Sequence, residues 1–386
     1  MKIGIDARLI NETGVGRYIR NLIEQLKALD RENQYVIYLP KDSYCDFVLP
    51  HSRWEKRLAT PRWHTFREQF IMPILFLKDD LDLLHVPYFT IPIFYPKKFV
   101  VTIHDLTILH FATGKATTLP YFFYTLRRLG YRLLLEFGLR KASAIIVPSQ
   151  ITKQEIIDHF HIPETKIHVT YEGVDRAIGK RKTPACRQGR ENGKRKLMTN
   201  PYFLYVGNAY PHKNLEMLVL AFADFIHSKK VQDEYRLVLV GKDDFFYNRL
   251  KTVVNNRKLD RNVLFLGQMD DETLREFYTH ARALVFPSLM EGFGLPALEA
   301  LSLETPVICS DLPIFHEILK NLPYYINPND KDEISRSFSV VVKKKKNEMK
   351  GKRNEIALLL KKYSWKQLGI DTILLYNSLG NTSTSV

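Results

Sequence analysis

The feature that most constrains this fold is a regular alternation of short apolar, β-branched runs with longer segments of helical periodicity. In the first half, the pattern predicts strands at residues 2–7, 35–39, 81–86, 99–103, 144–147 and 167–171, with a helix at 17–29. In the second half, it predicts strands at 202–206, 236–240, 263–266, 283–286 and 307–309, with helices at 215–226, 271–281 and 296–303. Such alternation is typical of βαβ units with parallel strands. The sequence therefore predicts an α/β protein with two parallel sheets.

A polar, basic segment separates the two series of strands. The chain has 386 residues and an apolar fraction of 45%, which is enough for two domains with cores of their own. Residues 176–196 contain nine basic residues and one acidic residue, Glu191, so we expect a linker at 176–200. The expected domains are then 1–175 and 201–363. Residues 363–379 have the pattern of an amphipathic helix, and we expect the small polar tail 381–386 to be disordered.

Cysteine usage, the start of the sequence and the length of its apolar stretches indicate the cellular compartment. The three cysteines, Cys45, Cys186 and Cys309, lack CxxC spacing and are odd in number, which favours a reducing compartment. We see no signal peptide at the start and no uncharged stretch near the ~20 residues that a spanning helix needs. We expect a cytoplasmic protein, either soluble or attached to the inner face of the membrane.

The formal net charge is +15, and a basic excess suits phosphates, nucleic acid or an anionic membrane surface. Basic residues cluster at 176–196 and 343–353, and at 53–67 they alternate with aromatic residues. Each cluster can be a solvated face. For the third, contact with a membrane surface is the alternative, because aromatic residues beside Lys and Arg fit the interface. We expect no nucleic-acid partner, because no recognition motif accompanies the charge.

The segment after the strand at 283–286 carries the most informative residues. A loop containing Glu291 leads into a helix in which Pro296 is well placed as the first residue. Backbone N–H groups of Phe293, Gly294 and Leu295 would then lie at a helix N-terminus, where anions and polar oxygens bind. Glu299, about one turn into the helix, can point its carboxylate toward a ligand bound at that N-terminus. An ordinary loop and helix with a solvated Glu299 is the alternative.

The segment after the strand at 202–206 supplies a cation. Gly207 and Asn208 begin a loop that ends at Lys213 and Asn214, and Asn214 can cap the next helix. An ammonium beside a helix N-terminus makes a good pyrophosphate site. A surface lysine before a helix is the alternative.

Two segments of the first half follow strands in the same way. Gly14 and Gly16 open a helix after the first strand, and glycines there allow a ligand close to the backbone, although a plain turn is the alternative. His104 follows the strand at 99–103, where it can bond a sugar or serve a structural role. No Asp-x-Asp pair stands out at a strand end, so we expect no metal ion and no other cofactor. Lys213 and helix dipoles would meet the charge of a nucleoside diphosphate instead.

Together these residues resemble glycosyltransferase family 4, and the resemblance runs nearly end to end. It is carried by the segments IGIDARL, GVGRY, EQFIMP, DLLHVPY, VTIHDL, ASAIIVPSQITKQEII, VTYEGVD, YVGNAYPHKNL, LVLVGK, FLGQMDDETLREFYTHARALVFPS, EGFGLPALEA, TPVICSD and YSW. The most specific element is the pair Glu291 and Glu299, separated by seven residues. The resemblance implies the GT-B fold, in which two Rossmann-like domains with parallel sheets face a central cleft. The C-terminal helix, here 364–380, crosses back to the first domain.

The resemblance also implies a reaction, the retaining, metal-independent transfer of a sugar from a nucleotide-sugar donor. By position, Glu291 would contact the sugar hydroxyls and Glu299 the nucleotide ribose, and Lys213 would neutralise the diphosphate. Gly14 and Gly16 would let the first domain close over the donor, and His104 would lie by the reacting sugar. The backbone around 293–295, with Gly207 and Asn208, completes the donor site.

The substrates follow from the same resemblance. The GVGRY, HDL and PHKNL segments look most like bacterial mannosyltransferases, which implies GDP-mannose, with UDP-glucose or a UDP-N-acetylhexosamine as alternatives. The acceptor would be a glycan or a lipid-linked saccharide of a surface polysaccharide. Many members have Arg at position 208 and a second basic residue, often Arg, at position 212, where this chain has Asn208 and His212. An inactive sugar-binding paralogue is therefore an alternative, and a nucleotide-sugar epimerase of the same fold is another.

Overall fold

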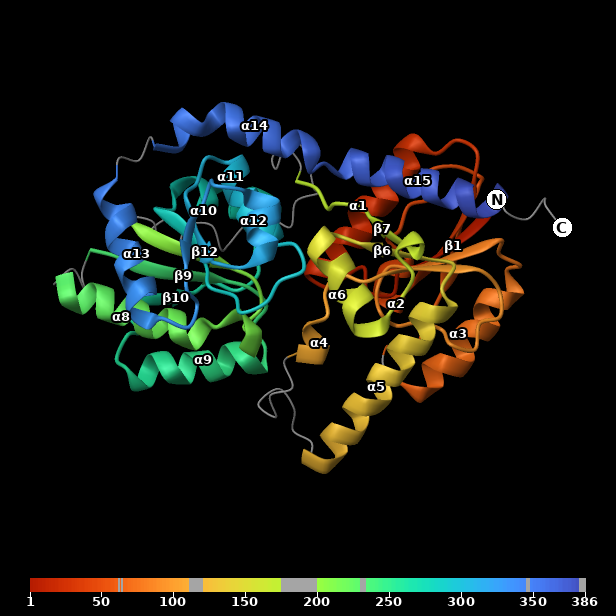
Figure 1. The fold of residues 1–386 in the computed structure, drawn as a ribbon, viewed down its shortest axis with the longest axis horizontal. Helices are drawn as coiled ribbons and strands as arrows, with labels where there is room; N and C mark the ends of the chain where they lie inside the picture. The colour runs from red at the N-terminus through yellow and green to blue at the C-terminus, as the bar shows by residue number, and fades with distance from the viewer. Residues whose placement is uncertain are drawn as a thin grey trace. The chain divides into compact units, whose positions relative to one another are not determined.

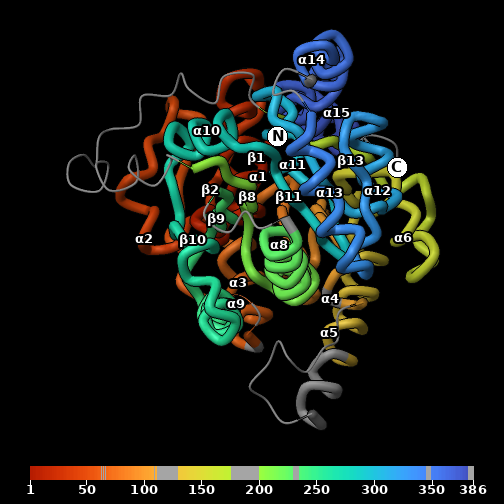
Figure 2. Tube along the Cα trace, turned by 90° about the vertical axis from the view of Figure 1, so that its left-hand side faces the viewer, coloured from red at the N-terminus to blue at the C-terminus, as the bar shows by residue number. Residues whose placement is uncertain are grey.

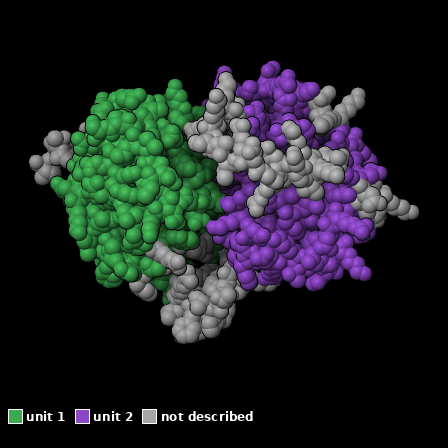
Figure 3. Space-filling view, turned by 180° about the vertical axis from the view of Figure 1, so that it is seen from behind, with its two compact units in different colours: residues 1–173, 363–386 green, residues 174–362 purple. Residues whose placement is uncertain are grey.

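The structure is a computed structural model that describes residues 1–61, 63, 65–110, 121–174, 200–229, 234–344 and 348–381. The chain divides into two compact units, coloured separately in Figure 3. Unit 1 comprises Met1–Gly173 and Tyr363–Val386, and unit 2 comprises Val174–Lys362. Residue 175, residues 176–199 of the predicted linker and residues 382–386 of the predicted tail lie outside the described residues.

Unit 1 contains a seven-stranded parallel sheet with the order β3-β2-β1-β4-β5-β6-β7. The strands are β1 (Lys2–Asp6), β2 (Gln34–Leu39), β3 (Trp54–Leu58), β4 (Leu83–Val86), β5 (Phe99–Thr102), β6 (Ala144–Val147) and β7 (Ile167–Val169). The helices are α1 (Gly14–Leu29), α2 (Lys41–Tyr44), α3 (Phe66–Lys78), α4 (Thr107–His110), α5 (Tyr121–Lys141), α6 (Gln150–Phe160) and α15 (Trp365–Asn381).

The helices of unit 1 cover both faces of its sheet. From β1 the chain runs through β2 to one edge, then returns across β1 to β4 and continues to the other edge. Because parallel crossovers are right-handed, this reversal places α3 and α5 on the face opposite α1. Figure 1 shows α1 and α15 on one side of the sheet and α3 and α5 on the other.

Unit 2 contains a six-stranded parallel sheet with the order β10-β9-β8-β11-β12-β13. The strands are β8 (Tyr202–Val206), β9 (Arg236–Val240), β10 (Val263–Phe265), β11 (Ala283–Phe286), β12 (Val307–Ser310) and β13 (Tyr324–Ile326). The helices are α8 (Leu215–Lys229), α9 (Phe245–Asn256), α10 (Asp271–His280), α11 (Leu295–Ser302), α12 (Pro313–Leu319), α13 (Lys331–Lys343) and α14 (Arg353–Lys362). Helices α8 and α13 pack side by side (Figures 1 and 2). When the strands of each unit are numbered in chain order, both sheets contain the doubly wound order 3-2-1-4-5-6, and unit 1 adds a seventh strand at the edge.

The structure adds two edge strands to those that the alternation predicts, β3 and β13. Strand β3 lies in the basic-aromatic stretch 53–67, for which solvated and membrane-bound states are the expectations. There the Trp54 ring is buried and stacks on Tyr35, with ring centroids 4.4 Å apart. The Lys56 ammonium donates to main-chain carbonyls, and Arg57 pairs with Asp79 at 2.8 Å. These side chains of the stretch therefore hold an edge of the sheet.

Candidate functional site

Two loops meet at the point in unit 2 where the strand order reverses. Neighbouring strands β8 and β11 are connected in opposite directions across the sheet, and in open α/β sheets ligands bind beyond the carboxyl ends of the strands at such a point. The loop after β8 ends in a short 3₁₀ turn, Pro211–Lys213, and the loop after β11 carries Glu291. The backbone N–H of Leu289 donates to the carbonyl of His212 at 2.7 Å, which ties the two loops together.

Lys213 and Glu291, predicted from separate motifs, form an ion pair between these two loops. The distance from Lys213 Nζ to Glu291 Oε1 is 2.6 Å. Their side chains are only 14% and 9% exposed, so Lys213 is not the surface lysine of the alternative interpretation. The ammonium also lies 5.6 Å from the centre of the Phe286 ring at the end of β11. An ammonium has three N–H donors, of which Glu291 takes one, so the arrangement can hold a second anionic or polar group.

Helix α11 starts beside Glu291. Gly294 precedes the helix with φ +90°, a left-handed conformation that suits glycine, and a Cβ there would lie 2.6 Å from Phe315. The helix begins at Leu295, so Pro296 is its second residue, one position later than predicted. The expected donors, the N–H groups of residues 293–295, are therefore at a helix N-terminus.

Glu299 is buried in α11 and is 3% exposed, so the alternative of a solvated helix acid is wrong. The hydroxyl of Tyr278, on α10, donates to Glu299 Oε2 at 3.0 Å. Since α11 follows directly from the Glu291 loop, both predicted carboxylates belong to one strand–loop–helix unit. Sequence reasoning did not find Tyr278, which stands 21 residues away on another helix.

Two tyrosines hold the loop after β8. Tyr205 donates to the carbonyl of Asn208 at 2.6 Å, and Tyr247 donates to that of Gly207 at 2.8 Å. Burial raises the pKa of Tyr205 well above its ordinary value, which keeps its hydroxyl protonated as a donor. The side chain of Asn214, expected to cap α8, instead donates its amide to the carbonyl of Pro328 at 2.7 Å. The loop is thus fixed at both ends.

Two further hydroxyls lie at the same carboxyl edge of the sheet. Ser288 follows β11, and Ser310 ends the neighbouring strand β12. Both side chains are fully buried, and neither hydroxyl has a hydrogen-bond partner among the described residues. A buried hydroxyl without a partner is costly, and a polar ligand at this edge is one way to satisfy it.

In unit 1 the predicted glycines follow β1 at the corresponding reversal of strand order. A Cβ on Gly14 would meet no atom within 4 Å, so the backbone is open there. A Cβ on Gly16 would lie 2.6 Å from the carbonyl oxygen of Ile10. The structure therefore gives Gly16 a packing role, and of the two glycines only Gly14 lies against open space.

His104 lies after β5 and is bonded through both ring nitrogens. Its Nδ1 is 2.9 Å from Glu172 Oε1, and its Nε2 is 3.1 Å from the carbonyl oxygen of Pro87. Burial lowers the pKa of His104, but the hydrogen bond and charge of Glu172 and the Pro87 carbonyl outweigh it, so the net shift is upward. Two acceptors suit the imidazolium, which donates from both nitrogens. The VTYEGVD segment contains Glu172, but nothing in its pattern identifies it as the partner of His104.

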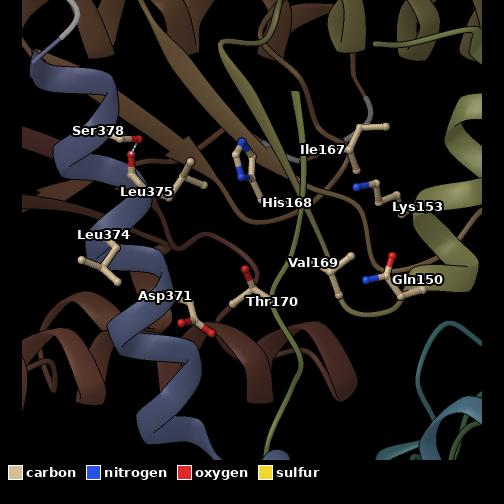
Figure 4. A pocket seen from close by; sticks show the side chains of 10 residues that line it. All are labelled: Gln150, Lys153, Ile167, His168, Val169, Thr170, Asp371, Leu374, Leu375 and Ser378. Carbon is tan, nitrogen blue, oxygen red and sulfur yellow. Dashed lines mark hydrogen bonds between the residues drawn. The ribbon is translucent and has the colours of Figure 1, made fainter. Parts of the chain in front are cut away.

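Grooves run along the edge strands β7 and β10 of the two sheets. Figure 4 shows one of about 490 Å³ in unit 1, lined by α6, β7 and α15, with His168, Lys153 and Asp371 among its side chains. None of the predicted site residues lines it.

The described residues include no group of three or more His, Cys, Asp or Glu side chains that could hold a metal ion. Among them there is also no helix with the length and apolar character needed to cross a bilayer.

Comparison with known proteins agrees with this architecture. Residues 13–177 match the model of Glycosyltransferase Family 4, and residues 189–357 match that of Glycosyl transferases group 1. The O-antigen chain mannosyltransferase RfbU of Salmonella typhimurium is 30% identical over 314 residues, which cover 80% of this chain and 79% of the relative. O-antigen chain mannosyltransferase B of Escherichia coli is 28% identical over 338 residues, covering 84% and 85%.

Solved structures share the fold. Sucrose-phosphate synthase from Thermosynechococcus elongatus superimposes with a TM-score of 0.76 at 20% identity, covering 99% of this chain and 100% of the other. HepE of Anabaena, solved in complex with UDP-glucose, has a TM-score of 0.71 at 15% identity, with complete coverage of both chains. From the family models and the relatives, the chain belongs to the glycosyltransferases of family 4, with two Rossmann-like domains of the GT-B fold.

Proposed function

We propose that the protein transfers mannose from GDP-mannose to a lipid-linked saccharide of a surface polysaccharide, with retention of anomeric configuration and without a metal ion. The observation that carries this proposal is the ion pair of Lys213 and Glu291 at the strand-order reversal of unit 2. It places a cation, a carboxylate and the N-terminus of α11 on neighbouring loops. A sugar linked to a diphosphate has the matching groups, namely hydroxyls beside two negative phosphates.

Each predicted residue of unit 2 has a role in this proposal. Lys213 and the backbone N–H groups of 293–295 neutralise the diphosphate, while Glu291 accepts hydrogen bonds from the sugar hydroxyls. Glu299, held by Tyr278, accepts from the ribose. Gly207 and Asn208 shape the donor loop, and Ser288 and Ser310 offer buried hydroxyls at the same edge. On unit 1, Gly14 leaves the backbone open to a ligand, whereas both ring nitrogens of His104 already bond Glu172 and Pro87, so we assign it no bond to the sugar.

The proposed reaction needs no protein nucleophile. The acceptor hydroxyl oxygen forms the new bond to the anomeric carbon on the face from which the diphosphate departs. The bond between that carbon and the phosphate oxygen breaks, and the leaving phosphate takes the acceptor's proton. The enzyme then acts by positioning and by stabilising the charge that develops on the diphosphate. The named activities of the two mannosyltransferase relatives support mannose as the sugar.

Substitution of Lys213 tests the donor site. We expect Lys213→Ala and Glu291→Ala to lower turnover at least ~100-fold, as expected for loss of a preorganised charge contact. The measurement is transfer of labelled mannose from GDP-mannose to lipid-linked acceptor, with NMR of the product to assign its anomeric configuration. Lys251→Ala is the matched control, because Lys251 forms an exposed ion pair with Asp243 at 2.7 Å in the same unit. Turnover of folded Lys213→Ala near that of Lys251→Ala contradicts the proposal.

The donor and the reaction class have their own tests. GDP-mannose should raise the melting temperature more than UDP-glucose does, because a ligand that binds only the folded state stabilises it. A larger rise with UDP-glucose would reassign the donor.

Transfer should continue in the presence of a chelator, and loss of activity that Mg²⁺ restores would contradict metal independence. Conversion of the donor without acceptor into an epimer would instead identify an epimerase.

A further inference from the structure

Exposed aromatic side chains gather on two neighbouring loops of unit 2. Among the described residues of this unit, the large apolar side chains that are exposed are Tyr210, Phe245, Val340 and Leu358. The two aromatic ones follow β8 and β9, which pair directly in the sheet, so their loops leave the same carboxyl edge side by side. Tyr210 is 42% exposed and Phe245, the first residue of α9, is 62% exposed.

Phe246 joins these two side chains into one group. Its ring meets that of Tyr210 edge to face, with centroids 4.9 Å apart, and that of Phe245 in the same way at 5.4 Å. The side chain of Asp244 accepts from the backbone N–H of Phe246 at 2.9 Å, which fixes the start of α9. We call Tyr210, Phe245 and Phe246 the aromatic platform.

The main chain holds Tyr210 in place. Its backbone is extended, with φ −61° and ψ 151°, as the following Pro211 favours. Its N–H donates to Oδ1 of Asn208 at 3.4 Å, and its carbonyl accepts from the N–H of Lys213 at 2.8 Å. These contacts do not involve the ring, so the ring can be removed without breaking the turn that carries Lys213. A side chain positioned before binding loses little conformational freedom on contact with a ligand.

The platform and the groups proposed for the donor lie on different sides of Lys213. The sheet has the order β9, β8, β11, and Lys213 follows β8. Glu291 and the helix that contains Glu299 follow β11, whereas the platform extends from the loop after β8 to the loop after β9. In the proposed reaction the acceptor attacks on the face from which the diphosphate departs. The acceptor must therefore lie beside the diphosphate that Lys213 neutralises, as the platform does.

The chemistry of the platform matches a sugar ring. A pyranose has C–H bonds on its faces and hydroxyls around its rim, so an aromatic face can bury the C–H groups while polar groups meet the hydroxyls. Tyr210 supplies both a ring and a hydroxyl. Its ring centroid lies 6.0 Å from that of His212, and Lys242 is exposed on the loop after β9.

We propose that the aromatic platform binds the acceptor, with the Tyr210 ring stacked on the pyranose that receives the transferred sugar. The inference rests on the proposed function, because it assigns a saccharide to the end of the acceptor where transfer takes place. It makes Tyr210 a residue that selects the acceptor, and it leaves the affinity for the nucleotide to the loops that hold Lys213 and Glu291.

Saturation-transfer NMR on the full-length protein tests the platform without depending on turnover. The probes are the methyl pyranosides of mannose, glucose, galactose and N-acetylglucosamine, and the signal identifies the C–H groups that lie against the protein. Tyr210→Ala removes the ring, and Tyr210→Phe keeps the ring but removes the hydroxyl. Leu358→Ala is the matched control, because it removes an exposed apolar side chain from α14 in the same unit.

We expect the wild type, Tyr210→Phe and Leu358→Ala to bind at least one pyranoside through ring C–H groups, and Tyr210→Ala to bind it at least ~10-fold more weakly. The rise in melting temperature that GDP produces should be the same in Tyr210→Ala as in the wild type. In the transfer assay, Tyr210→Ala should raise KM for the acceptor by ~10-fold and change KM for the donor by less than ~2-fold.

Equal pyranoside signals from the wild type and Tyr210→Ala, or no signal from the wild type, overturn the proposal. A smaller GDP-induced rise in Tyr210→Ala also overturns it, because nucleobases stack on aromatic rings and the platform would then belong to the nucleotide site. Pyranoside binding that depends on Tyr210, in a protein that does not transfer mannose from GDP-mannose, would support the platform and refute the proposed reaction. The two proposals can therefore fail separately.

Discussion

At the scale of single residues, Lys213 and Glu291 show how a cation can be kept ready for an anionic ligand. Their side chains are mostly buried, and a buried charge without a partner is strongly destabilising. The mutual contact at 2.6 Å keeps each compensated, while the remaining N–H groups of the ammonium can serve a phosphate. Removing either partner should thus affect stability as well as turnover, so the melting temperature must accompany each activity measurement.

The two glycines after β1 have different roles: Gly14 lies open to a ligand, and Gly16 packs against the main chain. We expect Gly16→Ala to destabilise the protein by ~1–3 kcal/mol, because its Cβ would lie 2.6 Å from one main-chain carbonyl oxygen and 2.9 Å from another. Gly14→Ala should change stability by only ~0.5 kcal/mol, since its Cβ meets nothing. Urea denaturation measures both. If Gly14 admits the donor, Gly14→Ala lowers turnover while its stability is normal, and equal destabilisation of the two variants contradicts the assignment.

At the scale of elements, the alternation of the sequence predicted most strands within one or two residues. Strands such as β6 and β11 are short, wholly apolar and flanked by polar residues, which makes their bounds clear. The pattern did not reveal β3, whose sequence WEKRL is mostly polar because it pairs on one side only. It also did not reveal β13, an edge strand of three residues. Edge strands bury less surface, so the apolar signal of the sequence is weakest there.

Helix α15 is attached to the sheet of unit 1 through a buried series of hydrogen bonds that no local sequence pattern could predict. The Tyr376 hydroxyl bonds to Nδ1 of His85 in β4, and His85 Nε2 lies 2.8 Å from the hydroxyl of Thr102 in β5. Thr102 lies 3.2 Å from the hydroxyl of Tyr18, whose ring contacts the edge of His104. The partners are up to 291 residues apart, so only the folded chain brings them together. The C-terminal helix is in this way connected to the neighbourhood of His104.

Tyr376→Phe tests this connection. The variant keeps the ring but leaves Nδ1 of a fully buried histidine without its partner, which should cost ~1–3 kcal/mol. Leu374→Ser on the same helix is the control, because Leu374 is 62% exposed and its loss should cost only ~0.5 kcal/mol. Urea denaturation compares the two. Equal stabilities would mean that the hydrogen bond does not hold α15.

At the scale of the whole molecule, both sheets share the strand order 3-2-1-4-5-6, and this order explains why motifs distant in sequence share a site. Lys213 and Glu291 are 78 residues apart, yet they follow strands that are neighbours in the sheet. The sequence supported both residues as candidates because each follows a strand, but it could not show that they pair with each other. Nor could it reveal Tyr278 or Glu172, because their contacts depend on tertiary packing.

The stability of unit 1 should fall on mild acidification, and His85 is the reason. Burial lowers the pKa of His85 from 6.5 to about 3, so the unfolded chain binds a proton between these values and the folded chain does not. The free energy of unfolding therefore decreases as pH falls below ~6.5, by at most roughly 5 kcal/mol at pH 3. His104 has the opposite effect on stability. Because its pKa is raised in the folded protein, its stabilising contribution is fully present below pH 6.5 and is lost as pH rises through its folded pKa. Asp30 has a lowered pKa, so its contribution is lost only below its ordinary value of 3.8.

Between pH ~6.5 and ~4.5 the expected loss is thus assigned mainly to the fully buried His85, with a contribution of the same sign from His168, whose pKa burial also lowers. Urea denaturation of the wild type across this range should show a falling free energy of unfolding. His85→Gln should be less stable than the wild type near pH 7, since it breaks the bonds to Tyr376 and Thr102, but its stability should vary much less with pH. The difference in free energy of unfolding between the two proteins therefore becomes smaller on acidification, because only the wild type loses stability when the unfolded chain protonates His85. Parallel pH profiles would contradict a neutral, buried His85 at the centre of the network.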